Sequence, residues 1–152
     1  MLVDIVSKGG NLLLNIAPSP LGEFDEGAYV LLDQIGKWMN VNSEAIYASR
    51  PIAPYKEGKV ALTQNRHSKA VYAIYLPSAE EHTLPSKMWL TTIQPEQGAS
   101  VQGASVKMLG IPGNLEWESV NEGFVVTIPD QIQNAGLPIE AWVLKISSVK
   151  TQ

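Results

Sequence analysis

A short apolar run near the N-terminus constrains the fold most strongly. It reads Asn11-Leu12-Leu13-Leu14-Asn15-Ile16-Ala17, and its apolar residues fall on both alternating faces of an extended chain. This pattern is typical of a strand buried on both sides within a parallel sheet. Each parallel crossover takes about a dozen residues or more, and only ten residues precede the run. Unless a downstream strand pairs with it, we predict that its neighbours lie in sequence outside this chain.

The flanking segments fit the same interpretation. Residues 2–8 have apolar positions in helical rhythm and end at Gly9-Gly10, a common helix stop. Two prolines in residues 18–22 end the predicted strand, and acidic residues then begin a predicted helix of about 17 residues. Its apolar stripe runs from Phe24 to Met39. Helix, buried strand, loop and helix together predict an α/β remnant, the last βα repeat of a larger domain.

The second half of the chain has the pattern of an antiparallel β-sandwich. Seven short strand candidates are separated by turn residues such as Gly, Asn and Pro, a spacing typical of that fold. Residues 47–58 contain Pro51, Pro54 and Gly58, and this composition predicts a linker. The linker would join two domains, residues 1–50 and residues 51–152. The predicted strands are residues 60–63, 70–76, 88–93, 106–109, 115–117, 124–128 and 141–146.

Composition excludes several classes of protein. The chain has 11 Lys and Arg against 15 Asp and Glu, a net charge of −4, and no basic run, so we expect no nucleic-acid partner. With 45% hydrophobic residues it is expected to be globular. No apolar run reaches a membrane span, and Asp4 stands where a signal peptide would carry a basic residue, so we expect no membrane partner and an unprocessed chain. Cysteine is absent, which excludes disulfides and cysteine-based metal sites.

Two blocks of sequence resemble a known family. Residues 2–18, LVDIVSKGGNLLLNIAP, and residues 35–51, IGKWMNVNSEAIYASRP, are similar in order and spacing to motifs of the α-L-fucosidases, family 29 of the glycoside hydrolases. In that family these motifs close a TIM-type (β/α) barrel, and a β-sandwich follows. The chain departs from the family pattern at Ala17, Leu21 and Ser43, the first and last of which stand where the family has glycine. These departures bear on the shape of the loop after the strand rather than on the fold.

The resemblance implies a function for a longer protein. It implies retaining hydrolysis of a terminal α-L-fucose, without a cofactor, by two carboxyl groups about 5–5.5 Å apart. In the family both carboxyls precede this segment, so we expect no catalytic residue in the 152 residues and no cleavage by this chain alone. The implied partners are a fucosylated glycan, bound by the intact enzyme, and the missing barrel segment of the same protein. Family members are often periplasmic, secreted or lysosomal, which leaves the localisation of this chain undecided.

Asn15 is the one candidate substrate-binding residue. Ligands of barrel enzymes bind at the carboxyl ends of the strands, which places the segment from Asn15 to Gly22 on the active-site rim. Its amide can hydrogen-bond a sugar hydroxyl or, equally, satisfy backbone groups at the strand end.

Other titratable residues have simpler structural explanations. Asp25 and Glu26 fall in the first turn of a predicted helix, where they stabilise the dipole. Glu116 and Glu118 share one face of a predicted strand and are expected to form a solvated outer row. The only two histidines, His67 and His82, are expected in exposed loops, so no metal site is predicted.

The aromatic residues support a rival hypothesis, a non-catalytic carbohydrate-binding module. Sugar-binding sandwiches stack exposed rings on sugars, and the strands here carry aromatic side chains. Against this, Trp117 and Trp142 fall in the inward-facing phase, and Tyr72 and Tyr75 must point to opposite faces. A third hypothesis is a truncated fragment without activity. The aromatic residues concerned are Trp89, Trp117, Trp142, Tyr72 and Tyr75.

The apolar strand and helix stripe also predict behaviour. Without a barrel, Leu12 to Leu14 and the stripe from Phe24 to Met39 would expose an unusually large apolar patch. We therefore expect self-association of the lone chain through its exposed barrel face.

Overall fold

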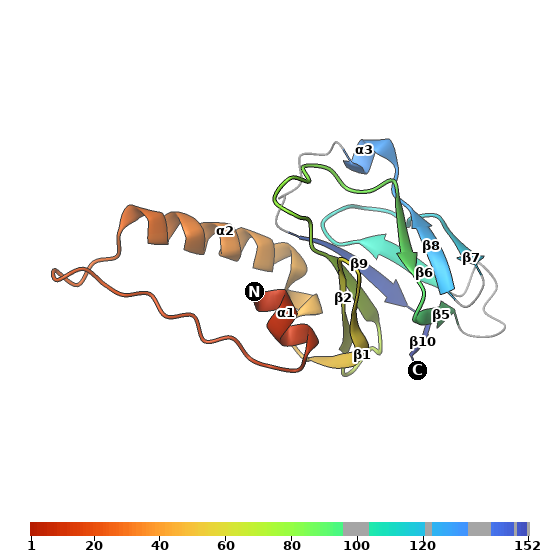
Figure 1. Ribbon diagram of the computed structural model, residues 1–152, viewed down its shortest axis with the longest axis horizontal. Coiled ribbons are helices and arrows are strands. Elements are labelled where there is room, and N and C mark those ends of the chain that lie inside the picture. Colours follow the sequence, from red (N-terminus) through yellow and green to blue (C-terminus); the bar gives the residue numbers. More distant parts are fainter. Residues whose placement is uncertain (96–103, 121–122, 134–140, 148, 152) are drawn as a thin grey trace.

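The computed structural model describes residues 1–95, 104–120, 123–133, 141–147 and 149–151 (Figure 1). The helices are α1 (Leu2–Ser7), α2 (Glu26–Asn42), the 3-10 helix η1 (Ser43–Ala45) and α3 (Asp130–Gln133). The strands are β1 (Ser49–Glu57), β2 (Val60–Asn65), β3 (Val71–Tyr75), β4 (Lys87–Leu90), β5 (Ile93–Pro95), β6 (Ser105–Met108), β7 (Trp117–Val120), β8 (Gly123–Thr127), β9 (Trp142–Ser147) and β10 (Val149–Thr151). None of the helices in these ranges is long and apolar enough to cross a membrane.

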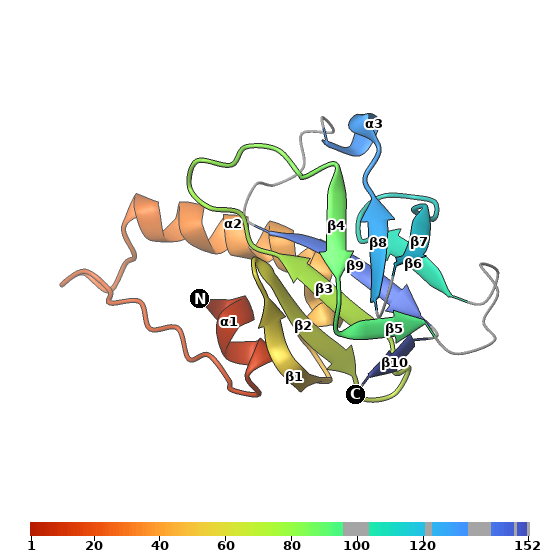
Figure 2. The same cartoon turned by 45° about the vertical axis from the view of Figure 1, so that its right-hand side comes forward.

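The strands form antiparallel sheets, as the sequence predicts. One sheet has five strands in the order β1-β2-β3-β9-β6, a second has three in the order β4-β8-β7, and β5 pairs with β10. All of these pairs are antiparallel. The five-stranded sheet lies between α1 and α2 on one side and the three-stranded sheet on the other (Figures 1 and 2). The molecule therefore has three layers.

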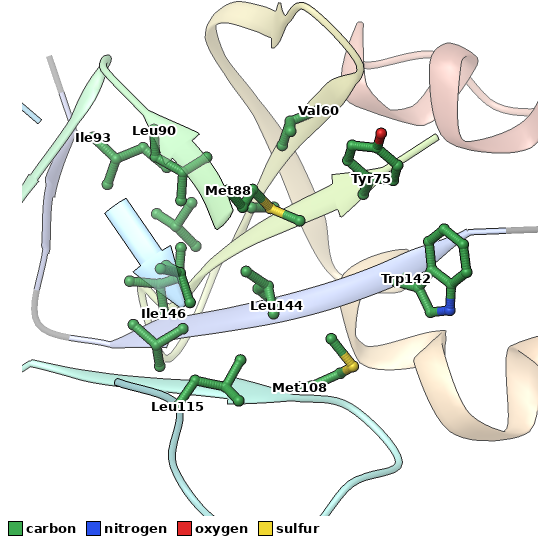
Figure 3. Close-up of a cluster of buried hydrophobic side chains, with 14 of the residues drawn as sticks. Val60, Tyr75, Met88, Leu90, Ile93, Met108, Leu115, Trp142, Leu144 and Ile146 are labelled. Atoms are coloured by element: carbon green, nitrogen blue, oxygen red, sulfur yellow. The ribbon is translucent and has the colours of Figure 1, made fainter. Parts of the chain in front are cut away.

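Two hydrophobic clusters hold these layers together. The larger lies between the two sheets and includes Met88, Leu90, Trp142, Leu144 and Ile146 (Figure 3). The smaller joins the helices to the opposite face of the five-stranded sheet. The alternation predicted for β9 is confirmed: Trp142, Leu144 and Ile146 belong to the first cluster and Val143 to the second. Because β3 is covered on both faces, all five of its residues are buried.

The predicted strands differ from the observed ones by a residue or two at their ends, and two of them differ more. The predicted strand over residues 88–93 is divided into β4 and β5, because Glu57 binds the chain between them: its carboxylate accepts hydrogen bonds from the backbone N–H groups of Thr91, at 2.9 Å, and Thr92, at 2.6 Å. The strand predicted at 115–117 begins only at Trp117.

Residues 11–17 form no strand in this structure, and the expected βα barrel unit is incomplete. The segment carries no regular secondary structure, although α1 and α2 on either side of it are formed. The reason is physical: an apolar strand needs a hydrogen-bonded neighbour, and no described strand pairs with these residues. In the sheet order, no described downstream strand pairs with residues 11–17. This is the condition under which we predicted that their neighbours lie outside this chain.

The stretch predicted to be a linker is instead β1. Residues 49–57 pair with β2 along the edge of the five-stranded sheet, so a strand stands where a linker was expected. The linker was predicted from Pro51 and Pro54, because proline interrupts central strands. Proline is tolerated, however, on an edge strand or at a bulge. The register of β1 shifts between Pro51 and Lys56, which accommodates both prolines.

Polar contacts fix the end of α2 to the sheet. The indole N–H of Trp38 donates to the Ala141 carbonyl at 2.9 Å, and the Thr63 hydroxyl donates to the Ala45 carbonyl at 2.8 Å. The carboxylate of Glu44, in η1, accepts from the Tyr72 hydroxyl at 3.1 Å and pairs with Lys145 at 2.6 Å. The C-terminal half of α2 thus packs on the outer face of the five-stranded sheet, whereas its N-terminal half extends beyond the sandwich (Figure 1).

Candidate functional site

The described residues leave one long segment uncovered, here called the N-terminal arm: residues 11–25 and the first two turns of α2. It projects away from the sandwich (Figure 1). Leu13 is 85% exposed and Leu21 is 87% exposed, values unusual for leucine. Of the twelve large apolar side chains exposed in the described residues, seven belong to the arm: Leu13, Leu14, Leu21, Phe24, Tyr29, Val30 and Leu31.

Asn15 lies near the start of the N-terminal arm. Its side chain is exposed, and the neighbouring Ile16 is only partly covered. Because the arm forms no strand, the structure gives no strand end for Asn15 to occupy. Its proposed contact with sugar therefore remains a prediction.

The acidic residues at the start of α2 have the structural role expected from the sequence. Asp25 is the N-cap, and its side chain accepts a hydrogen bond from the backbone N–H of Ala28 at 2.7 Å. Glu26 occupies the first turn, where negative charge favours the helix dipole.

No pair of carboxyls suited to glycoside hydrolysis is evident in the described part of the chain. A catalytic acid needs a raised pKa, so that it holds a proton near neutral pH. Among the described carboxyls, the two with a shifted pKa change in the opposite direction: Lys8 lowers the pKa of Asp4, and Lys59 lowers the pKa of Glu81 to about 2. Glu116 and Glu118 are both exposed, as expected, and Glu118 lies 3.9 Å from Lys87.

The two histidines are also exposed, as predicted, and they do not converge on a common site. His67 lies in the β2–β3 turn, where its backbone N–H donates to the Asn65 side chain at 2.9 Å. His82 follows the segment that contains Glu81. Among the residues that the structure describes, no group of three His, Cys, Asp or Glu side chains is arranged to hold a metal ion.

Most of the aromatic side chains are part of the core. Tyr72 and Tyr75 are buried on opposite faces of β3, and Trp142 is 5% exposed, as the sequence predicts. Trp117 packs at the edge of the larger cluster. Trp89 differs, because its side chain is 57% exposed on β4. The alternation of Lys87, Met88, Trp89 and Leu90 could have predicted this exposure. Met88 and Leu90 point inward, so Trp89 between them points outward.

Comparison with known proteins identifies the family. Residues 1–44 match the family model described as alpha-L-fucosidase, and residues 55–147, more than half of the chain, match the model of the alpha-L-fucosidase C-terminal domain. The chain belongs to the α-L-fucosidase family. The resemblance inferred from the two sequence blocks is therefore confirmed, and the fucosidase hypothesis is favoured over a free-standing glycan-binding module.

Individual fucosidases match nearly the whole chain. It is 34% identical to human tissue alpha-L-fucosidase over 152 residues, which is 98% of this chain and 30% of the human protein. The tissue alpha-L-fucosidase of Bos taurus is 38% identical over 153 residues, also 30% of its length. This chain thus spans about 30% of the length of the curated relatives that it matches.

Solved fucosidase structures show the same fold. A bacterial fucosidase crystallised with a triazole inhibitor aligns with a TM-score of 0.72 at 23% identity, over 99% of this chain and 30% of that one. The α-fucosidase of Thermotoga maritima, in complex with a mechanism-based inhibitor, aligns with a TM-score of 0.70 at 22% identity, over 95% and 32%. At these identities the likeness supports the fold alone. In the fucosidases the C-terminal domain is a β-sandwich.

Proposed function

We propose that this chain is the C-terminal part of a retaining α-L-fucosidase. Residues 1–50 complete the catalytic barrel as its last βα unit, and residues 51–152 form a β-sandwich that braces it. In the intact enzyme the reaction is hydrolysis of a terminal α-L-fucose from a fucosylated glycan. The carboxyl nucleophile and the acid/base come from the preceding barrel segment.

The observation that carries this proposal is the exposed N-terminal arm. Leu13 and Leu14 are 85% and 41% exposed, and in an extended strand two successive side chains point to opposite faces. Exposing them costs free energy in an isolated chain, since each buried leucine is worth about 1.5–3 kcal/mol. An extended segment with unused backbone donors and acceptors and apolar side chains on both faces is suited to insertion between two further strands.

The division into two domains has separate support. The two family models meet between residues 44 and 55, close to the proposed boundary at residues 50 and 51.

The two proposed domains are firmly connected. The polar contacts of Trp38 and Glu44 anchor the end of α2 to the sheet, so the last barrel helix and the sandwich would move as one body.

The test is to read the DNA upstream of Met1 and to express the continuous protein beside the 152-residue chain. We expect an upstream reading frame with a carboxyl pair and hydrolysis of nitrophenyl α-L-fucoside by the continuous protein, with retention of the anomeric configuration by NMR. The 152-residue chain alone should be inactive. Hydrolysis above background by that chain, when well folded, would overturn the proposal.

Asn15 gives a sharper test in the same continuous protein. If its amide hydrogen-bonds a sugar hydroxyl, Asn15→Ala should lower kcat/KM by about 10-fold, the value of one hydrogen bond of about 1.4 kcal/mol. Asn11→Ala is the matched control, because Asn11 lies at the opposite end of the segment and should leave kcat/KM unchanged. Equal effects of the two variants would place Asn15 outside the substrate site.

A further inference from the structure

Trp89 is the exception among the four tryptophans of the chain. Trp38 and Trp142 are 7% and 5% exposed, and Trp117 packs against the core, whereas Trp89 is 57% exposed. Tryptophan is highly buried on average, because its large ring gains much from leaving water. An indole held in solvent on a regular strand is a candidate contact for a ligand.

The ring lies on a regular, fixed surface. Trp89 pairs with Val125 of β8, and Val125 pairs in turn with Glu118 of β7, so the three residues form one row across the three-stranded sheet. Directly opposed residues share a face of a sheet, so all three face away from the core. At about 4.8 Å per strand, Trp89 and Glu118 are roughly 10 Å apart at their Cα atoms. Val125, between them, is fully buried, so neighbouring side chains cover the centre of the row and Trp89 and Glu118 are its exposed ends.

Two charged residues lie on the same face as the ring. Lys87 precedes Trp89 by two residues on β4 and pairs with Thr127 on β8. The ammonium of Lys87 lies 3.9 Å from the carboxylate of Glu118, and both side chains are more than half exposed. A donor, an acceptor and an aromatic face therefore lie together on a small area of the sheet.

This face points away from the proposed barrel. The helices cover one side of the five-stranded sheet, and the three-stranded sheet lies on its other side (Figure 2). A barrel completed by the N-terminal arm would attach on the helix side. The Trp89 face would then stay open to solvent in the intact enzyme.

We propose that the outer face of the three-stranded sheet binds a sugar ring of the glycan substrate, at a distance from the bond that is cleaved. The indole of Trp89 stacks on the apolar C–H face of a hexose, while Lys87 and Glu118 hydrogen-bond its hydroxyls. A hexose combines one flat apolar face with a rim of hydroxyls, which matches one ring flanked by a donor and an acceptor. A protein partner would instead need a larger apolar area than a single indole supplies. This inference rests on the proposed function, since it takes the ligand to be part of a fucosylated glycan.

The experiment uses the 152-residue chain labelled with fluorotryptophan, which gives one fluorine NMR signal for each of the four tryptophans. The probes are fucosyllactose, lactose and L-fucose. We expect the Trp89 signal, assigned with Trp89→Phe, to shift saturably with a dissociation constant on the order of 1 mM, as for a small open site. The other three signals should remain unchanged.

Variants separate the contributions of the ring and its neighbours. Trp89→Ala should abolish binding, here followed by saturation-transfer NMR of the sugar, and Trp89→Tyr should retain part of it. The double variant Lys87→Met, Glu118→Gln should weaken binding about 10-fold if both polar groups contact the sugar. Tyr29→Ala, which removes an exposed ring on the N-terminal arm, is the matched control and should bind like the unmodified chain.

Two outcomes would overturn the inference. One is a Trp89 signal that does not move with any of the three sugars. The other is a signal that moves with protein concentration in the absence of sugar, which would make Trp89 a contact between copies. The proposed function is tested separately, in the continuous protein. There, Trp89→Ala should leave hydrolysis of nitrophenyl α-L-fucoside unchanged and lower only that of the longer fucosylated glycan. Failure of sugar binding at Trp89 can therefore be distinguished from failure of the fucosidase activity.

Discussion

The sandwich and the N-terminal arm use similar apolar residues with opposite results. Leu144, in β9, is fully buried between the sheets, and Leu13, in the arm, is 85% exposed. Both belong to short apolar runs, so hydrophobicity alone does not distinguish them. The difference is that β9 has β3 and β6 as hydrogen-bonded neighbours within this chain, and no described strand pairs with the arm. Burial therefore depends on partners as much as on composition.

Truncation of one leucine in each region gives the largest contrast. Leu144→Ala should lower the free energy of unfolding by about 3 kcal/mol, because it leaves a cavity in the core. Leu13→Ala should change it by less than about 0.5 kcal/mol, since its side chain makes few contacts in the lone chain. Urea unfolding followed by circular dichroism measures both values. A comparable loss for the two variants would show that the arm is folded against the sandwich.

The N-terminal arm should also drive self-association. Its seven exposed apolar side chains exceed what a monomer usually leaves in solvent. Light scattering of the 152-residue chain should report a mass above that of the monomer, and Leu13→Asp combined with Leu31→Asp should reduce it towards the monomer. Gln34→Asp, at an exposed polar position on α2, controls for the added charge. A monodisperse monomer for the unmodified chain would contradict the expectation.

The same dependence on partners explains what the sequence could predict. The sandwich strands could be recognised because their alternation and their neighbours lie in the same sequence, as for Trp142, Leu144 and Ile146. The run from Leu12 to Leu14 has an equally clear strand pattern, but no pattern within it specifies whether its neighbours are present. At β1 a strand stands where a linker was expected, because Pro51 and Pro54 have the same local signal in a linker and at a sheet edge.

The candidate site was predictable only in part. Motif spacing identified the family and pointed to Asn15, and the N-cap role of Asp25 followed from its place before an apolar stripe. Trp89 itself was among the aromatic candidates, but its charged neighbours were not predictable, because Glu118 is far from Lys87 in sequence and joins it only through the pairing of β4, β8 and β7.

The connection between the two regions can be tested at Glu44. Its carboxylate accepts from the Tyr72 hydroxyl and pairs with Lys145, and burial, together with the Glu44 charge, raises the pKa of Tyr72. A double-mutant cycle with Tyr72→Phe and Glu44→Gln should give a coupling of about 1 kcal/mol, the usual value of one partly buried hydrogen bond. Strictly additive effects on urea unfolding would mean that this contact does not help to hold η1 on the sheet.

The smallest effect is expected at the sandwich surface, where Glu81 holds the loop after β3. Its carboxylate pairs with Lys59 at 2.7 Å, accepts from the Ser78 backbone N–H at 2.9 Å and accepts from the Tyr75 hydroxyl at 3.2 Å. The contact with Lys59 contributes most to lowering the pKa of Glu81, from 4.5 to about 2.

Because the folded state binds this proton more weakly than the unfolded state does, the carboxylate stabilises the fold above about pH 4.5. That stability is lost as the pH falls towards 2. Glu81→Gln should therefore be less stable than the unmodified chain at pH 7, and the difference should disappear near pH 2, as measured by thermal unfolding across this range. Glu80→Gln, one residue earlier and exposed, should show no such convergence. A difference between Glu81→Gln and the unmodified chain that is independent of pH would mean that Glu81 acts by packing rather than by its charge.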